Sequence, residues 1–101
     1  MHENTITENE AQTLRVIARY AEEVEGYRMA VARESDLGTG DLTFRVTRLM
    51  EASLKLDGMV AVAEESGLFS RAGGYIRRLV LEGRAPYEDH FELEGVAVIS
   101  A

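Results

Sequence analysis

The most regular pattern of apolar positions runs from residue 7 to residue 25. Apolar residues recur there at spacings of three and four, the period of an amphipathic helix; they are Ala11, Leu14, Ile17, Ala18, Ala21 and Val24. Thr7 and Glu10 have the spacing of a capping box, in which each side chain bonds to the backbone N–H of the other residue. The pattern predicts a helix over 7–25 that ends at Gly26.

Short helical stretches and glycines follow this first helix. Residues 30–37 can form two helical turns that end at Gly38. Thr39 is a suitable cap for a third helix near 40–56, which Gly58 would end. Phe44 falls on the polar side of that helix, a defect in an otherwise amphipathic pattern.

The second half of the chain has the pattern of short strands. Residues 59–63 are apolar and partly β-branched, which predicts a strand. Residues 66–74 contain three glycines and are expected to form a loop. Residues 75–82 favour the returning strand of a hairpin, although a helix also fits. Residues 91–99 are predicted to form a last strand after the turn at Pro86.

This order of elements resembles the winged helix-turn-helix family, in particular MarR-type and archaeal transcription regulators. The resemblance covers about residues 7–83. It rests on the T-x-x-E start of the first helix, on the segment ARESDLG at 32–38, on residues 49–54, and on DGMV at 57–60, where the family has Gly-Leu-Val before its wing. It implies an α+β fold, with three helices and a β-hairpin wing. Residues 1–6 would be a flexible N-terminus and 7–101 one domain with a C-terminal strand.

The function that this resemblance implies is sequence-specific binding of double-stranded DNA by a homodimeric transcriptional regulator. In helix-turn-helix proteins the recognition helix, here about 40–56, enters the major groove. The wing, about 59–82, would contact the backbone or minor groove. Arginine can bind guanine bidentately and threonine can contact thymine. The expected DNA-contacting residues are Thr39, Thr43, Arg45, Thr47, Arg48, Lys55, Arg71, Arg77 and Arg78.

Two alternatives remain open. Residues 42–47 alternate apolar and polar positions, as a half-buried strand does, and the chain from there to residue 83 is similar to ribbon-helix-helix proteins such as the MobC and NikA families. In that fold Thr43, Arg45 and Thr47 would contact bases from a strand. Glycines at 58, 73 and 74 would then lie inside helices, so the winged helix is preferred. The other alternative is a winged-helix protein–protein interaction module that does not bind DNA.

The charge distribution matters for a DNA-binding interpretation because the net charge is −7. Acidic residues are concentrated at the two ends of the chain, in residues 1–25 and 85–101. Residues 66–84 hold four arginines and a single acid, Glu82. The sequence therefore predicts a cationic strip in the middle of an otherwise anionic protein.

The remaining chemistry argues against an enzyme. The chain has no cysteine, which excludes disulfides and thiolate-held metals. Of its two histidines, His90 lies in the acidic segment EDHFE, which we interpret as a solvated turn. No phosphate-binding loop or dinucleotide fingerprint is present. We expect no cofactor, no small-molecule ligand, no membrane contact and a cytoplasmic location.

Overall fold

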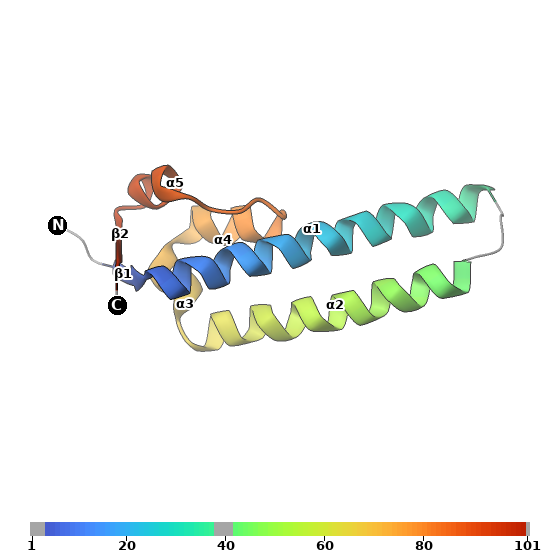
Figure 1. The fold of residues 1–101 in the computed structure, drawn as a ribbon, viewed down its shortest axis with the longest axis horizontal. Helices are drawn as coiled ribbons and strands as arrows, with labels where there is room; N and C mark the ends of the chain where they lie inside the picture. The colour runs from blue at the N-terminus through green and yellow to red at the C-terminus, as the bar shows by residue number, and fades with distance from the viewer. Residues whose placement is uncertain (1–3, 38–41, 101) are drawn as a thin grey trace.

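Two long helices run antiparallel beside each other and form most of the molecule (Figure 1). They are α1, Glu8–Leu37, and α2, Leu42–Glu65. The computed structural model describes residues 4–37 and 42–100. The hairpin gives the molecule an elongated shape, with extents of 56 × 22 × 19 Å.

The remaining elements gather at one end of the hairpin, where both described ends of the chain also lie (Figure 1). They are the short helices α3 (Leu68–Ala72), α4 (Gly74–Leu81) and α5 (Glu88–Leu93), and the strands β1 (Asn4–Thr7) and β2 (Val96–Ile99). The strands pair in parallel, with Ile6 opposite Val98. We call this end the head.

The first helix begins as the sequence predicts. The backbone N–H of Thr7 donates to Glu10 Oε1 at 3.0 Å, and the N–H of Glu10 donates to Thr7 Oγ1 at 3.1 Å. The predicted capping box is confirmed. The apolar face predicted for residues 7–25 is also confirmed, because Ala11, Leu14, Ile17, Ala18, Ala21 and Val24 are all buried.

The hydrophobic core lies in the head and joins every element there to the start of α1. Its largest side chains include Ile6 of β1, Leu14 of α1, Ile76 of α4 and Phe91 of α5. From α2 only Ala63 belongs to the buried cluster. The core therefore holds the head together and leaves most of α2 outside it.

The winged-helix prediction is wrong, because the segments assigned to the wing are helical. Residues 59–63 belong to α2, residues 75–82 fall almost entirely in α4, and α3 lies inside the predicted loop 66–74. Leu56, Met59, Val60 and Ala63 recur at helical spacing and pack on the core, which outweighs the β-propensity of a five-residue stretch.

The ribbon-helix-helix alternative is wrong as well. Residues 42–47, the expected DNA-contacting strand, form the first turns of α2. The predicted C-terminal strand 91–99 is confirmed only over Val96–Ile99, since Phe91 lies in α5. Residues 4–6, part of the expected flexible N-terminus, form most of β1.

Two of the three glycines predicted to end helices lie inside them, and the third, Gly38, lies outside the described residues. Gly26 is in α1 and Gly58 is in α2. Elements end instead at glycines with positive φ, such as Gly67 (φ 78°) and Gly83 (φ 80°). A glycine within a helix costs about 1 kcal/mol relative to alanine, which long flanking helices readily offset.

Candidate functional site

The part of the hairpin beyond the head, residues 25–37 and 42–58, is a two-helix arm, and no third helix or strand of the described chain lies along it (Figure 1). Ala63 is the only buried residue of α2, although this helix has 24 residues. Phe44, Leu54 and Val62 are 64%, 71% and 66% exposed. A helix of a globular protein normally buries an apolar stripe, so α2 has apolar surface that residues 4–37 and 42–100 do not cover.

An apolar groove lies between α1 and α2 where the arm meets the head. Its volume is about 710 Å³. Val16, Ile17 and Tyr20 line it from α1, and the main apolar side chains that α2 contributes are Leu54, Met59 and Val62. Its polar lining includes Gln12, Thr13, Lys55 and Ser66. The chemistry of this lining suits an apolar side chain better than a charged ligand.

The groove continues into a smaller hollow farther along the arm. This hollow has a volume of about 110 Å³, and Arg48 and Glu51 are among the residues that line it. Tyr20 and Lys55 line both cavities. Beyond Arg48 comes Phe44, whose ring lies 5.5 Å from the Arg48 guanidinium carbon. One continuous surface of α1 and α2 therefore runs from Val62 to Phe44, and we call it the groove face.

Three of the arginines expected to contact DNA are paired with carboxylates. Arg45 forms an ion pair with Glu34 at 3.3 Å. Arg71 binds Glu10 at 2.7 Å. Arg77 Nε donates to Glu64 Oε1 at 2.7 Å. Each pairing joins two different elements, so these arginines stabilise contacts within the chain.

The other predicted contact residues are distributed over two helices. Thr43, Thr47 and Lys55 are exposed on α2, where the Thr47 hydroxyl donates to the Thr43 carbonyl at 2.9 Å. Arg78 of α4 lies 5.5 Å from the centre of the Tyr75 ring. Thr39 lies outside the described residues. The structure brings Arg48 and Lys55 together on the groove face, but it places Arg71 and Arg77 in the head.

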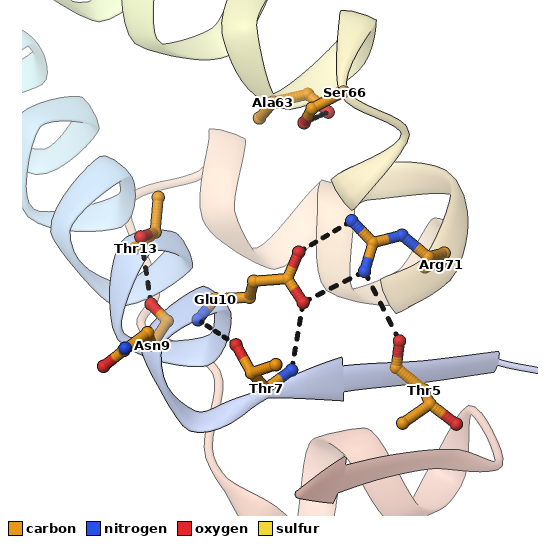
Figure 2. Close-up of polar contacts among 8 residues, drawn as sticks. All are labelled: Thr5, Thr7, Asn9, Glu10, Thr13, Ala63, Ser66 and Arg71. Atoms are coloured by element: carbon orange, nitrogen blue, oxygen red, sulfur yellow. Dashed lines mark hydrogen bonds and ion pairs between the residues drawn. The ribbon is translucent and has the colours of Figure 1, made fainter. Parts of the chain in front are cut away.

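The Arg71–Glu10 pair is the centre of a polar cluster in the head (Figure 2). Two guanidinium nitrogens donate to the two Glu10 oxygens, at 3.0 and 2.7 Å, and Nη1 also reaches the Thr5 carbonyl at 3.4 Å. The hydrogen bond from Arg71, followed by that from the Thr7 N–H, lowers the pKa of Glu10. The cluster ties α3 to β1 and α1, which is a structural role.

His90 also has a structural partner. Its Nδ1 accepts a hydrogen bond from the Tyr87 N–H at 2.9 Å and so helps to start α5. Among residues 4–37 and 42–100, no group of three or more His, Cys, Asp or Glu side chains is placed to hold a metal ion. Within the same residues, no helix is long and apolar enough to cross a membrane.

Sequence reasoning missed the groove face because it treated α2 as two elements. Once residues 42–65 are one helix, Phe44 and Val62 lie about five turns apart and share one side of it. The position of Phe44 on the polar side of the predicted recognition helix was the feature of the sequence that indicated this face.

We found no match to this chain among protein-family models, curated proteins or solved structures.

Proposed function

We propose that this chain is a protein-interaction module that forms a homodimer through the groove face. The observation that carries the proposal is the exposure of α2: a 24-residue helix buries only Ala63, while Leu54 and Val62 border an open apolar groove. Helical hairpins with such a face commonly pair into four-helix bundles, in which the second hairpin supplies the missing layer.

The apolar side chains on this face favour association. Phe44, Leu54 and Val62 are each more than 60% exposed, and fully burying a large apolar side chain contributes about 1.5–3 kcal/mol. A second copy that covers these three side chains on both protomers therefore stabilises the dimer.

Sedimentation equilibrium across a concentration series tests this function. The wild-type protein should pass from the chain mass of 11.2 kDa to twice that mass as its concentration rises. Val62→Glu places a charge in the groove and should keep the protein monomeric. Leu93→Glu is the matched control, because Leu93 is 77% exposed on α5 and does not line the groove. A wild-type protein that stays monomeric at high concentration contradicts the proposal.

DNA binding remains an untested prediction from the sequence, and the geometry gives it less support. The wing that was to hold Arg71 and Arg77 is absent from the described fold, and both arginines bind carboxylates. A mobility shift on duplex DNA at increasing salt tests it, because phosphate contacts weaken steeply as salt rises. We expect the protein to dimerise and to give no salt-dependent mobility shift with duplex DNA.

A further inference from the structure

The groove face has a symmetry that specifies how two copies fit together. One row of its positions along α2 is Phe44, Arg48, Glu51, Lys55, Gly58 and Val62. Their spacings are four, three, four, three and four, so the six residues lie along one side of the helix and the series reads the same in both directions. The midpoint of the series lies beside Ser53.

We propose that two copies pair their α2 helices antiparallel about Ser53, so that Phe44 of each copy enters the apolar groove of the other. This inference rests on the proposed homodimer and adds its register. Phe44 and Val62 lie about 27 Å apart along α2, from a rise of ~1.5 Å per residue. A two-fold axis at Ser53 therefore places Phe44 of one copy opposite Val62 and the groove of the second copy.

The charges on the groove face agree with this register. Glu51 and Lys55 lie two residues either side of Ser53, so Glu51 of each copy faces Lys55 of the other. Arg48 of each copy faces Gly58, which has no side chain and nothing within 4 Å of the position of a Cβ atom. The long arginine side chain therefore meets open space.

A parallel arrangement fits poorly. It would place Glu51 against Glu51 and Lys55 against Lys55, and like charges directly opposite each other are unfavourable. It would also bring Phe44 against Phe44, so neither groove would receive an aromatic side chain from the other copy. The antiparallel arrangement fills both grooves at once and is closed, as expected of an isologous dimer.

The size of the face meets the requirement for a specific dimer. The face is about 20 Å wide, the width of two adjacent helices, and about 27 Å long. Each copy therefore buries about 540 Å², and the two copies together bury about 1,100 Å², as estimated from these helix dimensions. Specific interfaces bury at least about 1,000 Å².

Charge reversal tests the register while leaving the apolar groove intact. Glu51→Lys and Lys55→Glu each create two like-charge contacts in the antiparallel dimer and should weaken it roughly tenfold. The double variant E51K/K55E restores both pairs and should recover wild-type affinity. In a parallel dimer, residue 51 faces residue 51 and residue 55 faces residue 55, so each single change only replaces one like-charge contact with another. Single variants that dimerise as tightly as the wild-type protein therefore overturn the antiparallel register.

Cysteine cross-linking locates the two helices directly, because the chain has no native cysteine. Arg48→Cys and Gly58→Cys are oxidised separately and as a mixture, with Phe44 and Val62 unchanged. The antiparallel register gives a disulfide-linked dimer only in the mixture. Cross-linking of each variant alone, or a sedimenting dimer without any cross-link, overturns the register but leaves the homodimer standing. A monomeric wild-type protein overturns both.

Discussion

Glu10 on the first turn of α1 receives hydrogen bonds from two directions. Its two carboxylate oxygens bind the guanidinium of Arg71 on α3, and Oε1 also accepts the N–H of Thr7. The side chains of Glu10 and Arg71 are 28% and 36% exposed, so the pair is only partly screened by solvent. One carboxylate thereby caps α1 and holds α3 against it.

We expect this carboxylate to make stability depend on pH. Because its pKa in the folded protein is lowered from 4.5, its contribution is complete above that value and is lost as pH falls through the folded-state pKa. Between pH 6 and pH 3, the wild-type protein should lose more unfolding free energy than Glu10→Gln. Urea unfolding at each pH measures the difference.

Glutamine is the matched replacement because it preserves the capping box while removing the charge. Parallel pH profiles for the two proteins would show that Arg71 does not stabilise the ionised form of Glu10.

Gly83 and Gly26 should respond oppositely to alanine. Gly83 has φ 80°, and a Cβ atom there would lie 3.0 Å from the backbone of Glu22, so Gly83→Ala should destabilise the fold by about 1–2 kcal/mol or more. Gly26 is helical with open space around it, so Gly26→Ala should stabilise by about 1 kcal/mol. Thermal unfolding of the two variants measures both signs. A destabilised Gly26→Ala protein would argue that α1 ends at Gly26.

These two glycines also show what the sequence can and cannot predict. The Thr7–Glu10 box and the apolar face up to Val24 depend on residues within a few positions of each other, so their spacing was sufficient. Whether a glycine ends a helix depends on the sign of φ that the surrounding chain imposes. The residue alone permits both outcomes, and the predicted ends at Gly26 and Gly58 were therefore wrong.

A related limit applies to the cationic strip predicted for residues 66–84. Residues 66–84 contain more arginines than acidic residues, and this excess can be counted in the sequence. In the fold, however, Arg71 and Arg77 bind Glu10 and Glu64, which lie 61 and 13 residues away. Partners at such separations follow from tertiary structure. A local charge count therefore overestimated the positive charge available to a ligand.

Glu94 should stabilise α4 from across the head. Its Oε1 accepts the N–H of Tyr75 in the first turn of α4 at 2.6 Å. Glu94→Ala should cost about 1 kcal/mol, the usual effect of losing a helix cap. Glu92→Ala, an exposed change in the same segment, should stay within about 0.5 kcal/mol of wild type. Chemical denaturation separates the two, and equal effects would mean that the contact contributes nothing.

Phe91 and Phe44 should separate the stability of the fold from that of the dimer. Phe91 is 1% exposed in the core, and Phe91→Ala should cost about 3–5 kcal/mol at any protein concentration. Phe44 is 64% exposed, so Phe44→Ala should change the unfolding free energy of the monomer by no more than about 0.5 kcal/mol.

Association stabilises only the folded state, so the Tm of the wild-type protein should rise with concentration. Phe44→Ala should abolish that rise, because the side chain that enters the second copy is gone. Melting curves at low and high concentration measure both effects, and a Phe44→Ala protein that keeps the full concentration dependence would place the interface elsewhere.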